Sequence, residues 1–140
     1  MERQMSFVPL LGRLMIGLPF MMSGLRKLAA YGPTVAGITA VGLPLPPLSY
    51  AAAVAIELGG GLLMVLGYRT RLIAAVQVVF VLMTAVFFHA RFGDPNQVNH
   101  FLKNIMITGG LLQIAYFGAG PWSLDSRFGV RGAAKLAPTV

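Results

Sequence analysis

Four long apolar stretches constrain this chain more than any other feature of its sequence. They run approximately over residues 7–25, 48–68, 72–90 and 104–120. Each is close to the roughly 20 residues that a helix needs to cross the hydrocarbon core of a bilayer. The sequence therefore predicts an all-α membrane protein in which four transmembrane helices form a bundle.

The composition agrees with a membrane environment and limits the kinds of chemistry open to the chain. Of the 140 residues, 56% are apolar and only 11% are charged, unlike the average soluble domain. This length allows one domain, residues 1–140, with no room for a separate soluble catalytic module. Because the chain has no cysteine, disulfides, thiolate metal sites and thiol–disulfide exchange are excluded.

The connections between the spans differ in character. In the first, residues 26–47, the positions of glycine and proline predict a short helix lying at the membrane interface between spans one and two. The second, residues 67–71, is tight enough to make spans two and three antiparallel. The third, residues 91–103, is polar and is expected to be a solvated loop. Residues 121–140 are expected to form a polar tail, with Trp122 in the headgroup layer.

The basic residues indicate an orientation in the membrane. Eleven Lys and Arg residues face four acidic ones, giving a net charge of +7, and they are scattered beside the apolar stretches. This scatter is typical of charges that set topology, and it argues against nucleic-acid binding. The larger group lies on the side of both termini, which are therefore predicted to be cytoplasmic: Arg3, Arg69, Arg71, Arg127, Arg131 and Lys135, against Arg26, Lys27, Arg91 and Lys103.

An ordered series of short motifs accompanies the spans. It comprises Leu11-Gly12-Arg13, Ser23-Gly24 with Lys27-Leu28, Gly42-Leu43-Pro44, Ile56-Glu57-Leu58-Gly59-Gly60-Gly61-Leu62, Gly67 through Thr70-Arg71, Phe87-Phe88-His89, Lys103-Asn104 before Gly109-Gly110-Leu111-Leu112, and Ser123-Leu124-Asp125. From Leu11 to Asp125 the series resembles the DoxX family of small four-span membrane proteins. The resemblance implies a multi-pass protein of a bacterial or archaeal cytoplasmic (inner) membrane. It also implies a link to redox chemistry, since the family is named after the membrane part of a thiosulfate:quinone oxidoreductase and other members look like partners of oxidative-stress enzymes.

Glu57 is the most informative single residue, because it lies deep within the second apolar stretch. Nine residues of helix place it about 13 Å into the span. A charged side chain at that depth costs ~2.5–3.5 kcal/mol on insertion scales. We therefore expect Glu57 to face the interior of the bundle and to have a cationic partner or a proton there. It is either a catalytic, proton-relaying residue or one half of a structural ion pair that fixes helix register.

Span one carries two candidate partners for this acid. Arg13, Phe20 and Lys27 recur at seven-residue spacing, which predicts one stripe of the helix facing the bundle. The long side chain of Arg13 can close much of the distance to Glu57. The sequence leaves open which basic residue pairs with the acid, and both Arg13 and Lys27 are candidate ligand-binding residues.

A second polar group is predicted at the other membrane level, formed by Lys27, His89, Lys103 and Asn104. A lone lysine at a helix end commonly anchors the helix, but four converging polar side chains fit a ligand site equally well. A quinone suits such a site, since an apolar ring carries two carbonyls that need donors at fixed positions. His89 is the candidate catalytic partner of Glu57, because imidazole can donate to a carbonyl or pass a proton. Lys103 or Asn104 would hold the other carbonyl.

These residues support two main functional hypotheses. The first is a quinone-linked oxidoreductase subunit, whose electrons come from a bound molecule or a redox partner protein. The alternative is a non-catalytic scaffold or anchor that recruits oxidative-stress enzymes; a small transporter would require oligomerisation, because the chain has no internal repeat. No metal is predicted, since a loop separates His89 from His100 and few carboxylates lie nearby. The expected partners are the lipid bilayer, a soluble or membrane redox protein and further copies of the chain.

Overall fold

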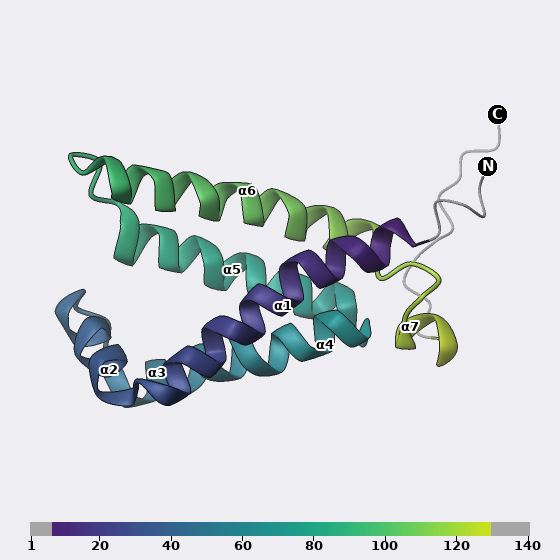
Figure 1. Ribbon diagram of the computed structural model, residues 1–140, viewed down its shortest axis with the longest axis horizontal. Helices are drawn as coiled ribbons and strands as arrows, with labels where there is room; N and C mark the ends of the chain where they lie inside the picture. The colour runs from purple at the N-terminus through teal and green to yellow at the C-terminus, as the bar shows by residue number, and fades with distance from the viewer. Residues whose placement is uncertain (1–6, 130–140) are drawn as a thin grey trace.

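The computed structural model describes residues 7–129, and within that range the protein is built from helices and connections without strands. The predicted cations Arg3, Arg131 and Lys135, and most of the predicted tail, lie outside the described residues. The helices, labelled in Figure 1, are α1 (Val8–Ala29), α2 (Tyr31–Ala40), α3 (Pro46–Val54), the π-helical segment η2 (Ala55–Gly59), α4 (Gly60–Leu66), α5 (Thr70–His89), α6 (Pro95–Phe117) and α7 (Leu124–Arg127).

Three helices are long and apolar enough to cross a membrane. They are α1, α5 and the continuous helix Pro46–Leu66, which α3, η2 and α4 form together. The expected spans at residues 7–25, 48–68 and 72–90 correspond to these helices, although α1 continues four residues further, to Ala29. The helix α2 is the short helix predicted between the first two spans.

The fourth expected span differs from the prediction. The polar segment that we expected to be a loop is instead the first part of α6, which begins at Pro95. Asp94 explains this start, because its side chain accepts a hydrogen bond from the backbone N–H of Asn96 (2.9 Å) while Pro95 occupies the first turn. Its polar N-terminal turns leave α6 out of the group of helices apolar enough to span by composition alone. The loop before it is reduced to a few residues after His89.

The helices form two antiparallel pairs that meet along part of their length. The hairpin of α5 and α6 runs along one side, and α1 packs against η2 and α4 on the other (Figure 1). The buried core between them is small and apolar, formed by Met64, Ala74, Val81 and Leu111, with Phe20 packed against it. Phe20 therefore lies on the inward stripe of α1, as its spacing predicts.

Small residues allow α1 to approach the second span closely. A Cβ atom at Gly24 would lie 2.7 Å from the backbone nitrogen of Leu58, and one at Gly61 would lie 2.8 Å from the carbonyl oxygen of Gly17. Lipid provides no hydrophobic force between helices, so such close backbone contact is the main source of their attraction. The glycines therefore fix the distance between α1 and η2, which carries Glu57.

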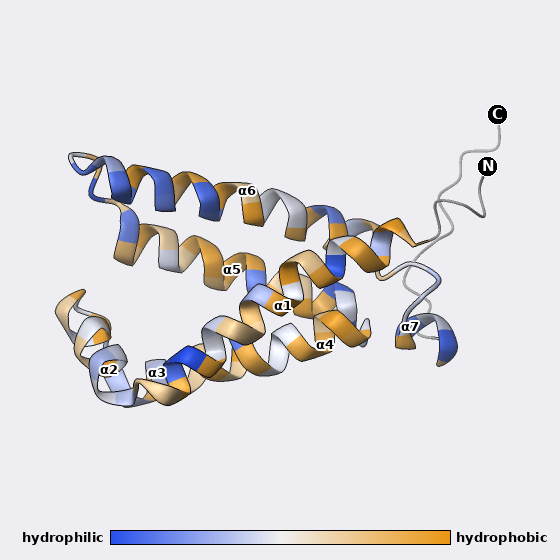
Figure 2. Ribbon diagram, in the orientation of Figure 1, coloured by the Kyte–Doolittle hydropathy of each residue, from blue (hydrophilic) through white to orange (hydrophobic). Residues whose placement is uncertain are grey.

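The outward faces of the helices are apolar. On α1 the exposed large side chains include Leu11, Met15, Leu18, Met22 and Leu25, and α5 presents a similar surface. Hydrophilic colour in Figure 2 gathers at the end of α6 next to α5, on the last turns of α1, and at the opposite end of the molecule. An apolar surface between polar ends is the arrangement that a bilayer requires.

Candidate functional site

Glu57 lies in η2, where the helix widens from the α to the π geometry. A π-helical turn inside a longer helix is uncommon, and such turns are often found at functional sites. The side chain of Glu57 is only 8% exposed. The expectation that this acid faces the interior of the bundle is therefore confirmed.

The partner of Glu57 is Lys27. The ammonium nitrogen of Lys27 lies 2.8 Å from Oε1 and 2.7 Å from Oε2 of Glu57, so the lysine bonds both carboxylate oxygens. The side chain of Lys27 is 28% exposed, which leaves one side of the pair accessible. Pairing is what permits a carboxylate at this depth, since an isolated one would be costly to bury.

Two neighbouring hydroxyl groups hold Lys27 in position. Its third ammonium proton is donated to Oγ of Ser23, one turn earlier on α1, at 3.1 Å. The hydroxyl of Tyr50 on α3 donates to the backbone carbonyl of Lys27 at 3.2 Å. Because Ser23 accepts from Lys27, its own proton remains available for donation to another group. In the sequence, Ser23 stood out only as part of the motif series and Tyr50 was not used, although the i, i+4 spacing of Ser23 and Lys27 was a usable signal.

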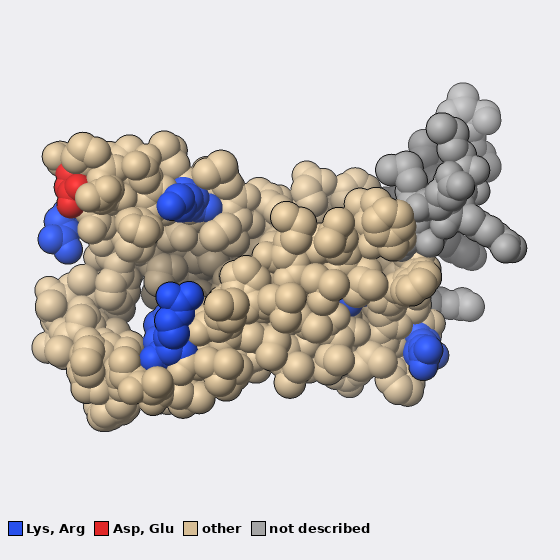
Figure 3. Space-filling view, in the orientation of Figure 1, with Lys and Arg blue, Asp and Glu red and all other residues tan. Residues whose placement is uncertain are grey.

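The space-filling view shows a hollow near this end of the molecule. In Figure 3 the surface is recessed between the α5–α6 hairpin and the side formed by α1, α2 and α3. Basic side chains border it on both sides, over the C-terminal end of α1 and over α6. Lys27 belongs to the first of these walls and Lys103 is the basic residue of α6.

His89 belongs to a second polar cluster, at the tip of the α5–α6 hairpin. Its Nδ1 atom lies 2.8 Å from Oε1 of Gln97. Its ring also stacks on that of His100, with centroids 5.0 Å apart and an interplanar angle of 24°. Because α6 already begins at Pro95, the two histidines are neighbours across a helical hairpin, and the expected separation by a loop was wrong.

The remaining members of the predicted outer group are spread along α6. Lys103 is exposed and Asn104 is half-buried, and the backbone carbonyl of Asn104 accepts a hydrogen bond from Thr108 (2.8 Å). The structure thus joins Lys27 to Glu57, and His89 to Gln97 and His100. No hydrogen bond within the described part of the chain links these two clusters directly. Within residues 7–129 no group of three or more His, Asp or Glu side chains could hold a metal ion.

Arg13 has a different role from the one that its spacing suggested. It is fully buried, and its guanidinium donates to the backbone carbonyls of Met64 (3.2 Å) and Val65 (3.1 Å), and to that of Trp122. A Cβ atom at Gly67 would overlap the guanidinium, so glycine is required there. Arg13 therefore joins α1, the end of α4 and the segment before α7, and it does not neutralise Glu57.

Comparison with known proteins places this architecture in a family. The model of the DoxX family matches residues 8–90, which include α1 to α5, and thus the Lys27–Glu57 pair. The chain belongs to the DoxX family. It is 34% identical over 118 residues to the inner membrane protein YqjF of Escherichia coli K12, covering 83% of this chain and 88% of that protein. It is 36% identical over 124 residues to the inner membrane protein YphA of the same organism, covering 84% and 88%. No solved structure matches the chain significantly.

Membership of the DoxX family agrees with the apolar exterior. Both relatives are named as inner membrane proteins, and three helices here are suited to crossing a bilayer. The protein is therefore an integral membrane protein. Its most unusual internal feature, a carboxylate and an ammonium group paired at a π-helical turn, lies within the part that matches the family model.

Proposed function

We propose that this DoxX-family protein is a redox-linked membrane subunit that binds a quinone, or a related small aromatic molecule, in the hollow between α1–α3 and the α5–α6 hairpin. The observation that carries the proposal is the Lys27–Glu57 pair, which is buried on the side of Glu57 and accessible on the side of Lys27. A pair with only a structural role does not require this opening, whereas a ligand site does.

The residues around the hollow fit the needs of such a ligand. Ligand sites are mostly apolar with a few well-placed polar groups, and an apolar ring with carbonyl oxygens needs hydrogen-bond donors. Ser23 has a free hydroxyl proton, and Lys27 can exchange its bond to Ser23 for one to the ligand. His89 holds Nδ1 toward the amide oxygen of Gln97, so Nε2 is left to accept a proton. Lys103 and Asn104 lie further along the same hairpin.

Quinone supplies two-electron, two-proton chemistry when bound, and the chain's own residues handle the protons. Glu57 can take up a proton through Lys27, because the two groups share hydrogen bonds at 2.7 and 2.8 Å. Glu57 itself is buried, so its proton exchange with the hollow passes through the more exposed Lys27. Electrons come from a bound molecule or a redox partner protein, since the chain has no cysteine that could supply them itself.

The proposal includes a topology. We place α6 across the membrane as a fourth span, because it returns along α5 and carries its polar turns at the end next to the hairpin loop (Figure 2). Both termini then lie on one side, and the distribution of basic residues supports placing that side in the cytoplasm. The proposal also includes association with a soluble or membrane redox protein and with further copies of the chain.

Binding of decylubiquinone to the protein in lipid nanodiscs, followed by isothermal titration calorimetry, tests the function. Glu57→Gln removes the charge that holds Lys27, and His89→Ala removes the proton acceptor on the hairpin. Each is expected to weaken binding by roughly tenfold or more, because each removes or misplaces a hydrogen-bonding group of the ligand. The variants must first elute as folded protein in size-exclusion chromatography.

Asp94→Asn is the matched control, since it removes one carboxylate charge at an exposed helix cap and asparagine still caps well. It is expected to bind like the natural protein. Unchanged binding in both site variants, or failure of the natural protein to bind decylubiquinone, would reject the quinone site and favour the alternative, a non-catalytic scaffold that recruits oxidative-stress enzymes.

A further inference from the structure

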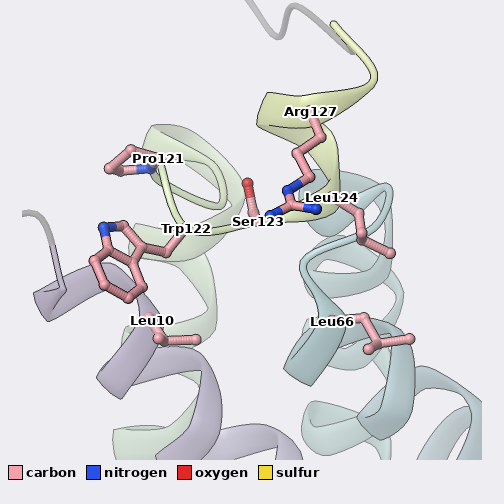
Figure 4. A pocket seen from close by; sticks show the side chains of 7 residues that line it. All are labelled: Leu10, Leu66, Pro121, Trp122, Ser123, Leu124 and Arg127. Atoms are coloured by element: carbon pink, nitrogen blue, oxygen red, sulfur yellow. The ribbon is translucent and has the colours of Figure 1, made fainter.

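A separate pocket lies at the opposite end of the bundle from the Lys27–Glu57 pair. It has a volume of about 510 Å³ and is formed where α1, α4 and the segment leading to α7 meet (Figure 4). Leu10, Leu66 and Leu124 give it apolar walls, Trp122 stands at one side, and Arg127 lies across its mouth. None of these residues takes part in the proposed quinone site.

The position of the pocket is that of the membrane–water interface. Here α1 begins at Val8, α4 ends at Leu66, α5 begins at Thr70 and α6 ends at Phe117. Trp122 is 61% exposed. Tryptophan prefers the headgroup level, so Leu10 and Leu66 lie on the hydrocarbon side of the pocket and Arg127 on the water side.

The charge in this pocket is positive and uncompensated by its own lining. Arg127 is the charged residue among those that form it. The nearest acid in sequence, Asp125, is not part of the lining, and its carboxylate accepts from the backbone N–H groups of Arg69 (2.7 Å) and Thr70 (2.9 Å). The buried guanidinium of Arg13 bonds the carbonyl of Trp122 just behind the pocket, but the Asp125 carboxylate offsets its charge, so the positive charge at the pocket is that of Arg127.

We infer that this pocket binds an anionic phospholipid, with its phosphate at Arg127 and the start of an acyl chain between Leu10 and Leu66. Figure 4 shows the required order of groups, because the guanidinium lies above and the two leucines lie below, toward the membrane-spanning helices. A soluble phosphate would make no use of the apolar walls. A zwitterionic lipid would carry a second, cationic group against the arginine.

The protein supplies its own reporter for this site. Trp122 is the only tryptophan of the chain and lines the pocket, so its fluorescence is quenched when a brominated acyl chain enters. The protein is reconstituted in phosphatidylcholine nanodiscs, and brominated phosphatidylglycerol or brominated phosphatidylcholine is added in increasing proportion. The lipid content that gives half-maximal quenching is expected to be about fivefold lower for phosphatidylglycerol than for phosphatidylcholine. This is the size of effect expected from one basic side chain near an anionic lipid surface.

Three variants separate the site from general attraction to the membrane. Arg127→Gln should abolish the preference for phosphatidylglycerol, whereas Arg69→Gln, an exposed cation at the same end but outside the pocket, should preserve it. Leu66→Phe should reduce quenching by both lipids, because it fills the apolar part while keeping Arg127. All three retain Trp122 as the probe.

The possible outcomes either support or overturn the lipid pocket. Loss of preference in the Arg127 variant alone, together with weaker quenching in the Leu66 variant, supports the lipid pocket. Equal loss in the Arg127 and Arg69 variants, or equal quenching by both lipids in the natural protein, overturns it. Sodium phosphate that displaces brominated phosphatidylglycerol, where sodium chloride of equal ionic strength does not, would assign the site to a soluble anion instead.

Discussion

Two cations of α1 meet the low dielectric of the bundle in different ways. Lys27 gives all three of its ammonium protons to Ser23 and Glu57. Arg13 gives its protons to backbone carbonyls, and its Nε atom is buried without a hydrogen-bond partner. The position of the Lys27 side chain therefore depends on the charge of Glu57, which can be removed. The position of the Arg13 side chain depends on the backbone carbonyls that it contacts. Lys27 is therefore a candidate functional residue, whereas Arg13 has a structural role in holding parts of the backbone together.

Lys27→Met should leave the Glu57 carboxylate buried without a cation. The free energy of unfolding is expected to fall by about 3 kcal/mol, the low end for breaking a buried pair, because Lys27 is partly exposed. Adding Glu57→Gln should recover more than half of this loss, since the unpaired charge is then gone. Unfolding in mixed micelles by SDS titration measures all three proteins. Arg26→Met, the exposed neighbour, should change stability by no more than about 0.5 kcal/mol; equal losses at the two positions would show that the ion pair has no special weight.

At the scale of the helices, the geometry of the pair is set by the second span and its contact with α1. The π-helical turn Ala55–Gly59 shifts the register of Glu57 relative to the α-helical residues before it. Gly24 and Gly61 let the two helices come close enough for Lys27 to reach both carboxylate oxygens. The π turn and the glycines together position the acid, and neither depends on the charge itself.

Gly24→Ala should separate these helices. The new Cβ atom would lie 2.7 Å from the Leu58 nitrogen and 2.8 Å from its Cβ atom, and the backbone of η2 cannot move aside at little cost. A loss of about 1–3 kcal/mol in the free energy of unfolding is expected, typical of overpacking. Gly12→Ala on the same helix is the matched control, because nothing lies within 4 Å of its Cβ position. Similar stability of both variants in SDS titration would mean that the close approach contributes little.

For the molecule as a whole, the path of α6 determines on which side of the membrane the C-terminal end of this helix lies. Its C-terminal end is tied to the rest of the bundle: Gly118 lies against Arg71, Gly120 against Pro9, and the Trp122 carbonyl receives Arg13. Its N-terminal end is tied to α5 through the His89–Gln97 hydrogen bond. Being held at both ends beside an apolar helix favours a crossing despite its polar first turns.

Single cysteines at Phe92 and Phe128 test this crossing in bacterial cells. Both positions are exposed, 62% and 70%, and the chain has no cysteine of its own to interfere. A membrane-impermeant maleimide should label the Phe92→Cys protein in intact cells and the Phe128→Cys protein only after permeabilisation. Labelling of both in intact cells, or of neither, would place the two ends of α6 on one side and leave three spans.

The sequence by itself determined the membrane class, the positions of three spans, the short helix after the first, and the need of Glu57 for an internal partner. These follow from one-dimensional quantities, namely the length of apolar runs and the cost of a charge in hydrocarbon. The start of α6 could also have been predicted from the sequence, because Asp94 and Pro95 form a typical helix start. The polarity of the residues after them led instead to the prediction of a loop. Only the tertiary structure decided that Lys27, and not Arg13, meets the acid, and that His89 stacks on His100. Which basic residue meets Glu57 depends on how one helix is rotated and shifted against the other. The glycine contacts and the π-helical turn set this rotation and shift at the level of tenths of an ångström. The spacing of residues along the chain does not encode it directly.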